Sequence, residues 1–368
     1  MMGIIWKCLP LIGTLFLAAC DELGQLGQSS ETTKPADVET FQIGITSGLS
    51  RLPWSIARRS GAIDAIEQHE RLRLNFVRFA NEADAVEAYA AGQIDGVTST
   101  LNTVIGTLET NARDTHVVLL TDFSRGAHGI LSRRVQSPSD LADKRVHVQH
   151  NTASHYLLFR ALERYNMAID DVELIDTSAS ALLQGAIDNE IETLVAGAPL
   201  LGQLRGLPEL REIMTSEQLA SEMVGGVMVD GPTLSENPKL GDALVDVWFA
   251  AIGYLMADHT TFTQAGLNDI SKLSGLSIEV VKDLLHPRDL ISDPEQSLIL
   301  MDGTNLNTAI FGGQRFRTAV GEHLCTKADP RACLFTREGD VIENGVGTRL
   351  VLDKQYLERF AESTFDAR

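Results

Sequence analysis

Short apolar runs alternate with helix-like segments over much of this chain, and this alternation constrains the fold more than any other feature of the sequence. Runs typical of strands, such as FQIGIT and LRLNFVRF, are each followed by a stretch with helical spacing of its apolar residues. Such alternation predicts βα units around a mainly parallel sheet, which places the chain in the α/β class. Its 368 residues, of which 44% are hydrophobic, are enough for two domains.

One short phrase, glycine followed by any residue, isoleucine and aspartate, occurs twice in the same local setting. It begins at Gly92 in AAGQIDGV and at Gly185 in QGAIDNEI, each time between a helix-like and a strand-like segment. A glycine at this point can adopt a positive φ, which ends the helix and lets the chain re-enter the sheet. The repetition predicts two lobes built on the same plan.

The sequence becomes mainly helical after Gly226, as expected for a chain that returns from a second lobe to cover the first. We therefore expect one lobe from residues 41–123 plus 227–368 and another from residues 124–226, with a cleft between them. Small residues can absorb the dihedral changes of a hinge. Gly225 and Gly226 are therefore predicted at the return crossing.

The N-terminus has the features of an export signal. The apolar run CLPLIGTLFLAA follows Lys7 and is too short to span a bilayer as a mature helix. It ends in LAAC, which resembles the lipobox of bacterial lipoproteins, where the chain is cut before the cysteine and the cysteine is acylated. We expect a signal peptide over residues 1–19, a lipid such as palmitate on Cys20 and a flexible tether over residues 20–40. An ordinary signal peptide with an incidental cysteine is the alternative.

Few cysteines remain after this processing. If Cys8 is removed with the signal peptide and Cys20 carries lipid, only Cys325 and Cys333 are left. In an oxidising compartment these two are expected to form a disulfide, which would close a short loop and contribute about 2 kcal/mol. Two free thiols are the alternative. No metal is expected, because two cysteines with no histidine at ligand spacing close to them cannot complete a tetrahedral site.

Charge and motifs exclude several function classes. The formal net charge is −19 and no basic stripe is present, which argues against a nucleic-acid partner. The sequence has no GxSxG, HExxH or P-loop motif, and no GxGxxG in a strand-to-helix setting. No nucleophile with a positioned base can be proposed from residue spacing. We therefore expect no catalytic residue and no cofactor.

Four segments together resemble a known protein family. They are IARRSGAIDAIE, DAVEAYAAGQIDGV, the stretch from Ser137 to Asp176, and ALLQGAID. They are similar to the extracytoplasmic solute-binding proteins of ABC importers, in the nitrate, sulfonate, taurine and pyrimidine-precursor branch. The similarity covers about residues 41–230. It implies a two-lobed periplasmic-binding-protein fold with a ligand cleft between the lobes, and an ABC permease in the inner membrane as the partner.

This resemblance has two departures. One is the first loop, SGLSRLPWS, which is not diagnostic of a ligand. In the other, Ala198 and Pro199 stand where the family often has an aromatic and an acidic residue. The resemblance therefore predicts the fold more firmly than it predicts the substrate.

Candidate ligand contacts follow from the rule that ligands of open α/β sheets bind beyond the carboxyl ends of strands. Polar residues that follow predicted strands are the candidates in each half of the chain. In the first half they are Ser47, Ser50, Trp54, Thr98, Ser99 and Thr100. At the first crossing and in the second half they are Arg125, His128, Asn151, Thr152, Ser154 and His155.

Two of these groups are predicted to hold an anion. Thr98 to Thr100 precede a helix, whose free backbone amides and dipole can bind a negative group without a basic side chain. Residues 151–155 repeat this arrangement and form the strongest candidate loop, because one helix cap does not explain so many consecutive polar groups.

The other candidates each have a structural alternative. Arg125 can pair with a carboxylate or sulfonate, or can be a solvated loop residue. Trp54 can stack on the ligand or pack in a wall, and Ser50 can be a simple helix cap. His128 and His155 would favour an anion when protonated, although a structurally bonded histidine is commoner.

The sequence as a whole predicts a lipid-anchored receptor at the periplasmic face of the cell membrane. It would bind a small anionic or zwitterionic metabolite as a monomer and pass it to the permease without transforming it. A sensory lipoprotein that signals to a membrane partner through the same fold is one alternative. A periplasmic enzyme on this fold is another.

Overall fold

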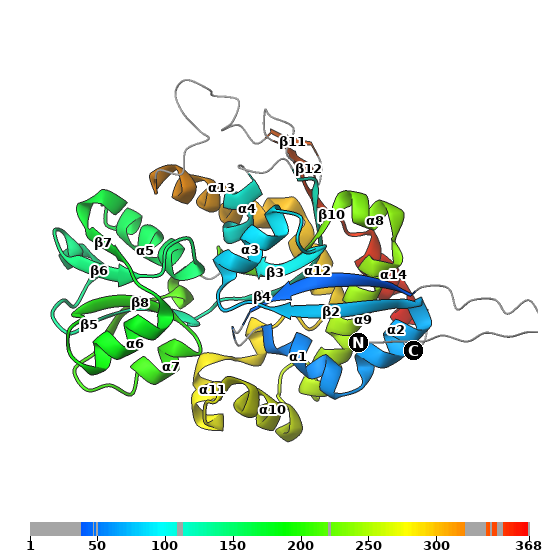
Figure 1. Cartoon of the computed structure of the whole chain (residues 1–368), viewed down its shortest axis with the longest axis horizontal. Helices are drawn as coiled ribbons and strands as arrows, with labels where there is room; N and C mark the ends of the chain where they lie inside the picture. Colours follow the sequence, from blue (N-terminus) through cyan, green and yellow to red (C-terminus); the bar gives the residue numbers. More distant parts are fainter. Residues whose placement is uncertain are drawn as a thin grey trace, which may run out of the picture. The chain divides into compact units, whose positions relative to one another are not determined.

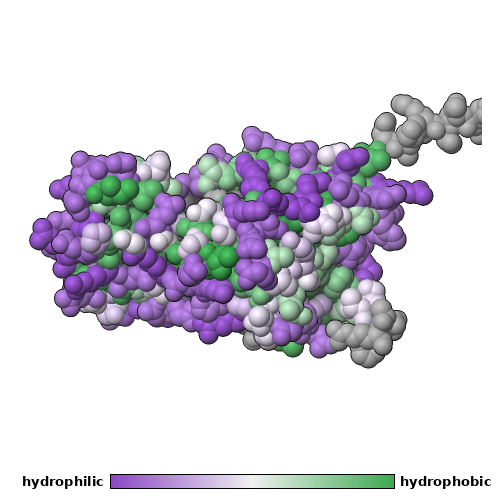
Figure 2. All heavy atoms as spheres, turned by 90° about the horizontal axis from the view of Figure 1, so that it is seen from below, coloured by the Kyte–Doolittle hydropathy of each residue, from purple (hydrophilic) through white to green (hydrophobic). Residues whose placement is uncertain are grey.

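The computed structural model describes residues 38–46, 48, 51–108, 113–219, 222–320, 336–338, 341–343 and 349–366. The predicted signal peptide, Cys20, and the Cys325 and Cys333 pair lie outside these residues. Within the described part of the chain, no helix is both long enough and apolar enough to cross a membrane. On the face seen in Figure 2, hydrophilic residues predominate and hydrophobic ones form small separate groups.

The first sheet has eight strands in the order β11-β12-β13-β4-β10-β3-β1-β2 (Figure 1). The strands are β1 (Glu39–Ile45), β2 (Leu72–Arg78), β3 (Gly96–Thr100), β4 (Thr115–Phe123), β10 (Val224–Asp230), β11 (Thr336–Glu338), β12 (Val341–Glu343) and β13 (Arg349–Leu352). β1 pairs in parallel with β2 and β3, whereas β10 is antiparallel to β3 and β4.

The second sheet has five strands in the order β7-β6-β8-β5-β9. They are β5 (His128–Ser132), β6 (Arg145–Val148), β7 (Glu173–Asp176), β8 (Thr193–Gly197) and β9 (Arg211–Thr215). β6 is parallel to β7 and β8, and β5 is antiparallel to β8 and β9. The order β2-β1-β3-β10-β4 in the first sheet has the same directions, so the two sheets share one five-strand plan. Each sheet is mixed rather than mainly parallel, because β10 in the first and β5 in the second run against their neighbours. In the first sheet β12 is also antiparallel to β11 and β13.

Fourteen helices are assigned in the described residues. Those up to β10 are α1 (Leu52–Arg59), α2 (Ala62–Glu70), α3 (Glu82–Ala90), α4 (Leu101–Leu108), α5 (Ala153–Arg164), α6 (Ala179–Ile187) and α7 (Leu200–Leu204). Those after it are α8 (Gly231–Glu236), α9 (Lys239–Leu255), α10 (Gln264–Ser274), α11 (Ile278–Leu284), α12 (Pro294–Met301), α13 (Gly303–Ala319) and α14 (Gln355–Asp366).

The two copies of the repeated glycine phrase differ in conformation. Gly92 follows α3 with a φ of +71°, as predicted for a helix stop. Gly185 instead lies inside α6, and the left-handed residue after that helix is Asn189, with a φ of 60°. A Cβ on Gly185 would stand 2.6 Å from the Ile191 side chain, so this glycine permits close packing rather than a turn.

Gly225 and Gly226 also differ from the prediction, because they lie within β10 and not in a crossing between lobes. Gly225 is opposite Thr100 on one side and Asp122 on the other. A Cβ on Gly225 would overlap the Asp122 carboxylate and the Arg51 guanidinium. The missing side chain therefore makes room for a buried charged pair, and no hinge role follows from it.

The segment after β10 packs on both sheets. α9 packs against α1 and α2, and α14 packs against α9. Phe316 in α13, however, belongs to the core of the second sheet, where its ring centroid is 5.7 Å from that of Tyr156. The prediction that residues 227–368 cover the first lobe is therefore incomplete, because an aromatic side chain of α13 is buried against α5.

Candidate functional site

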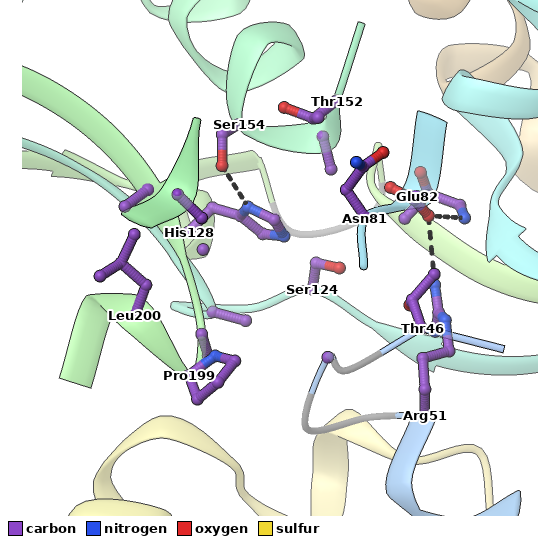
Figure 3. A pocket seen from close by; sticks show the side chains of 18 of the residues that line it. Thr46, Arg51, Asn81, Glu82, Ser124, His128, Thr152, Ser154, Pro199 and Leu200 are labelled. Atoms are coloured by element: carbon purple, nitrogen blue, oxygen red, sulfur yellow. Dashed lines mark hydrogen bonds and ion pairs between the residues drawn. The ribbon is translucent and has the colours of Figure 1, made fainter. Parts of the chain in front are cut away.

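A cavity of about 180 Å³ is lined by residues from both sheets (Figure 3). Most of these residues follow the carboxyl end of a strand, where ligands of α/β proteins bind. From the first sheet and its helices they include Thr46, Arg51, Asn81, Glu82, Thr100, Ser124 and Arg125. From the second they include His128, Gln149, Thr152, Ser154, Ala179, Leu182, Pro199 and Leu200. Leu284, Leu285 and Asp289 complete the lining from the segment around α11.

Glu82 is the central charged group on the first-sheet side. It is the first residue of α3, and its side chain reaches the N-terminus of α4. Its Oε1 accepts hydrogen bonds from the Ser99 hydroxyl at 2.8 Å and the Thr100 amide at 2.5 Å. Its Oε2 accepts from the Thr103 hydroxyl at 3.2 Å. The predicted anion site at residues 98–100 is therefore already filled by a carboxylate of the chain itself.

Arg51 lies beside Glu82 and joins it to a second carboxylate. Its Nη2 is 3.7 Å from Glu82 Oε1, and its Nη1 donates to Asp122 Oδ1. The Thr121 hydroxyl donates to the same Asp122 oxygen at 2.7 Å. Both side chains of the Arg51–Asp122 pair are buried. Because two carboxylates surround it, Arg51 brings little uncompensated positive charge to the cavity.

The second-sheet side of the cavity presents uncharged polar groups. Thr152 caps α5, where its hydroxyl accepts from the His155 amide at 3.4 Å. The Ser154 hydroxyl is 2.9 Å from His128 Nδ1. Burial lowers the pKa of His128 to about 4; the nearby Glu82 partly opposes this effect, and Arg51 adds to it. His128 is therefore neutral at pH 7, contrary to the prediction that it would favour an anion by protonation.

Asp289 is the least expected residue of the lining. It ends a short 3₁₀ turn (Pro287–Asp289) and is 2% exposed. Its Oδ2 accepts from the His286 amide at 2.8 Å, but its Oδ1 accepts no hydrogen bond from any residue that the structure describes. Burial raises the pKa of this carboxyl, and the His286 amide, Arg125 and Arg288 only partly oppose the effect.

An apolar surface forms most of the remaining lining. It comes from the start of α5, from α6 and α7, from the residues around β8 and from the end of α11. Its members are Ala153, Ala179, Leu182, Val195, Ala196, Ala198, Pro199, Leu200, Leu284 and Leu285. Figure 3 shows Pro199, Leu200, His128 and Ser154 on one side of the cavity and Arg51, Asn81 and Glu82 on the other, with Ser124 between them. The two sides therefore differ in chemistry.

Five of the sequence-predicted residues line this cavity. They are Thr100, Arg125, His128, Thr152 and Ser154. Arg125 stacks over the Phe123 ring at 4.4 Å and donates from Nη1 to the Arg288 carbonyl at 3.0 Å.

The other described candidates lie elsewhere. Thr98 and Ser99 are fully buried in β3. Asn151 precedes the Thr152 cap, and its amide donates to His155 Nδ1 at 3.3 Å. His155 is 1% exposed and stacks on His150, with ring centroids 4.9 Å apart. Because burial lowers the pKa of His155 to about 3, it is a neutral core residue.

Trp54 also lies away from the cavity, in the core of the first sheet. Its side chain is fully buried, with ring centroids 5.5 Å from Trp248 and 5.9 Å from Phe76. It borders a different surface hollow, whose rim includes Arg58 and Arg78. The structural alternative for Trp54, a packed wall residue, therefore describes it better than ligand stacking. Ser47 and Ser50 lie outside the described residues.

Sequence reasoning missed three charged residues of the site. Asn81 and Glu82 follow β2, so the same strand-end rule could have selected Glu82. Arg51 lies between the candidates Ser50 and Trp54, but a single arginine in a loop forms no sequence pattern that predicts a ligand contact. Asp289 gave no local signal. It is brought to the cavity by the neighbouring Ile291, whose amide donates to the Thr121 carbonyl at 2.8 Å.

Comparison with known proteins identifies the family. The sequence model of the family described as NMT1/THI5 like matches residues 68–258, which is more than half of the chain. No curated protein sequence matches this chain.

Solved structures agree on the fold. The periplasmic aliphatic sulphonate-binding protein SsuA from Escherichia coli has a TM-score of 0.62 and 16% identity, covering 82% of this chain and 93% of that chain. The nitrate-binding protein NrtA from Synechocystis PCC 6803 has a TM-score of 0.52 and 12% identity, covering 89% and 98%. A Candida albicans protein described as having the generic periplasmic binding protein fold has a TM-score of 0.59 and 13% identity, covering 78% and 92%.

These findings confirm the predicted fold class and the resemblance stated from the sequence. The chain belongs to the NMT1/THI5-like family and has the two-sheet architecture of the periplasmic binding proteins.

Proposed function

We propose that this chain is the solute receptor of an ABC importer and that it captures a small metabolite without transforming it. The observation that carries the proposal is the cavity, because residues at strand ends of both sheets line it. A ligand held there contacts both lobes at once and thereby favours the closed arrangement of the lobes. The permease then recognises the closed receptor.

The names of similar structures support this class of function. The Escherichia coli protein is named as a sulphonate-binding protein and the Synechocystis protein as a nitrate-binding protein. Both are therefore described as binders of small molecules rather than as enzymes. Because their sequence identity to this chain is low, the ligands in their names are not assigned to this chain.

The charges around the cavity favour a zwitterionic ligand over a purely anionic one. Glu82 and Asp289 contribute negative charge to the lining, and Arg125 contributes positive charge. A ligand with charges of both signs can pair with both kinds of group, whereas a simple anion would face two carboxylates.

The N-terminal sequence supports an anchored receptor. In this proposal a lipid on Cys20 holds a monomer at the periplasmic face of the cell membrane, and Cys325 and Cys333 form a disulfide. Replacing the cysteine in C20A should move the protein from the membrane fraction to the soluble periplasmic fraction. If the protein stays in the membrane fraction, the lipid anchor is wrong.

Thermal unfolding of the mature protein tests the receptor function. The panel should contain nitrate, alkanesulfonates, taurine, amino acids, amines and pyrimidines. A ligand at 100 times its Kd should stabilise the folded protein by about 2.7 kcal/mol. Mass spectrometry of the same mixtures should show the ligand unchanged. Product formation would favour an enzyme, and no stabilisation by any member would contradict the receptor.

A further inference from the structure

The end of α4, where an oxyanion would bind to free amides, is occupied by the protein itself. A helix N-terminus attracts an anion through its unpaired N–H groups and its dipole. Here the Thr100 amide and the hydroxyls of Ser99 and Thr103 all donate to Glu82. An anionic ligand would have to displace this carboxylate or lie beside it. The site as built therefore disfavours a negative group near α4.

Asp289 supplies an independent observation that points to a ligand. Its side chain is 3% exposed, and Oδ1 has no hydrogen-bond donor among the described residues. Arg288 Nε lies 4.0 Å from this oxygen, within reach of an ion pair but beyond hydrogen-bond distance. A buried carboxylate oxygen without a donor is costly, and a donor supplied by the ligand would remove that cost.

The charged groups around the cavity favour a positively charged ligand group. Arg51 is committed to Asp122 and lies 3.7 Å from Glu82. His128 is neutral at pH 7 because burial lowers its pKa. When the ion-pair partners behind the lining are counted, four carboxylates, those of Glu82, Asp122, Asp289 and Glu217, face three guanidinium groups, those of Arg51, Arg125 and Arg288. The described part of the cavity carries a net negative charge.

We propose that the ligand presents a protonated nitrogen, a primary ammonium or an amidinium, whose N–H group donates to Asp289 Oδ1. This inference rests on the proposed receptor function and deepens it by naming the ligand class. Glu82, which is held in place by α4, is a second carboxylate of the same lining.

The body of the ligand that carries this nitrogen is apolar. Leu284 and Leu285 belong to the segment that carries Asp289 into the cavity, and Leu182 and Leu200 face it from α6 and α7. An alkyl or aryl body attached to the nitrogen would be buried against these side chains, gaining about 25 cal/mol for each Å² removed from water. A small amine with an apolar body therefore matches the lining, and nitrate or a short sulfonate does not.

Matched probes separate the contribution of charge from that of shape. Hexylamine, 6-aminohexanoate and hexanoate share one body and carry a cation, both charges and an anion. Benzylamine, 4-(aminomethyl)benzoate and benzoate repeat the series with an aryl body. Calorimetric titration of the full mature protein should give the tightest binding for the members with an ammonium group. Hexanoate and benzoate should bind at least tenfold more weakly than their ammonium-bearing counterparts.

The variant D289N keeps an oxygen acceptor for the His286 amide but removes the charge. It should weaken binding of the amines at least tenfold and leave the binding of the anions unchanged or stronger. E82Q should weaken amine binding less, because Glu82 acts through its field and not by direct contact. D293N is the matched control, since Asp293 is exposed and asparagine caps α12 equally well. Unliganded melting temperatures identify any variant that fails to fold.

The outcomes distinguish the inference from the receptor function. Tight binding of the amines to the wild-type protein that is lost in D289N supports both the cationic ligand and the receptor function. Binding of nitrate or a sulfonate with no response to amines keeps the receptor and overturns the cationic ligand. Equal binding of amines to the wild-type protein and D289N also overturns it. If neither these probes nor the broad metabolite panel binds, the receptor function and the inference fail together.

Discussion

The two walls of the cavity follow the same strand-end geometry but have opposite chemistry. The first-sheet wall holds Arg51 and Glu82, with Asp122 behind them, and these groups are bonded to one another or to the backbone. The second-sheet wall, in the described residues, has only neutral polar groups and apolar side chains. Two lobes with one strand plan therefore do not make two equivalent binding surfaces. One wall supplies fixed charge and the other supplies apolar contact.

The largest effect should come from the packing behind the charged wall. Trp54→Ala removes a fully buried indole that contacts Trp248 and Phe76, and should lower the free energy of unfolding by about 4 kcal/mol. Ligand affinity of the folded fraction should change little, because Trp54 does not line the cavity. Urea unfolding and titration measure the two quantities. The half-exposed Phe311 offers a control, since Phe311→Ala should cost less than about 1 kcal/mol. If the folded fraction of Trp54→Ala bound the ligand much more weakly than the wild-type protein, Trp54 would be part of the binding site after all.

A somewhat smaller loss is expected when the charged wall itself is broken. Asp122→Ala leaves the Arg51 side chain buried without its closest carboxylate among the described residues, and should lower the free energy of unfolding by about 3 kcal/mol. Asp64→Ala removes an exposed partner of Arg58, 3.7 Å away, and should cost less than about 0.5 kcal/mol. Equal losses of unfolding free energy in the two variants would contradict the expectation that the buried Arg51–Asp122 pair contributes more than the exposed Arg58–Asp64 pair.

The neutral wall should respond to pH in stability and not in affinity. The folded-state pKa of His128, about 4, lies below its ordinary value of 6.5, so the unfolded chain binds the proton first as the pH falls. Stability should therefore be full above pH 6.5 and decline towards pH 4. His128→Gln should reduce the slope, although His155, with a pKa of about 3, leaves part of it.

The exposed His69 provides the matched control, and His69→Gln should leave the slope unchanged. Affinity for a ligand should not rise between pH 7.5 and 5.5. A clear rise in that range would indicate that His128 becomes charged and binds an anion, as the sequence suggested.

The same contrast shows which features could be predicted from the sequence. The alternation of elements and the return of the chain after the second sheet follow from local periodicity, and both appear in the topology. The strand-end rule selected Thr100, Thr152 and Ser154 correctly as cavity residues, because it depends only on element order.

Properties that depend on tertiary partners were beyond sequence reasoning. The terminus of α4 looked free because nothing local shows that Glu82, 18 residues earlier than Thr100, fills it. Gly225 looked like a hinge because its neighbours in the sequence do not reveal its role. That role is to leave space for Arg51 and Asp122, which are far away along the chain. Asp289 reaches the cavity only through packing of its segment against β4, where Leu290 bridges to Asp122.

The central claim is that a ligand binds in the cavity between these two walls, and filling that cavity tests it most directly. Ser124 is 6% exposed and lies between the walls in Figure 3. The measurement is the thermal stabilisation of Ser124→Phe by the ligand that stabilises the wild-type protein most, with Ser139→Phe at an exposed position as the control. The account predicts that stabilisation is lost in Ser124→Phe and kept in Ser139→Phe. Wild-type stabilisation of a folded Ser124→Phe protein would contradict it.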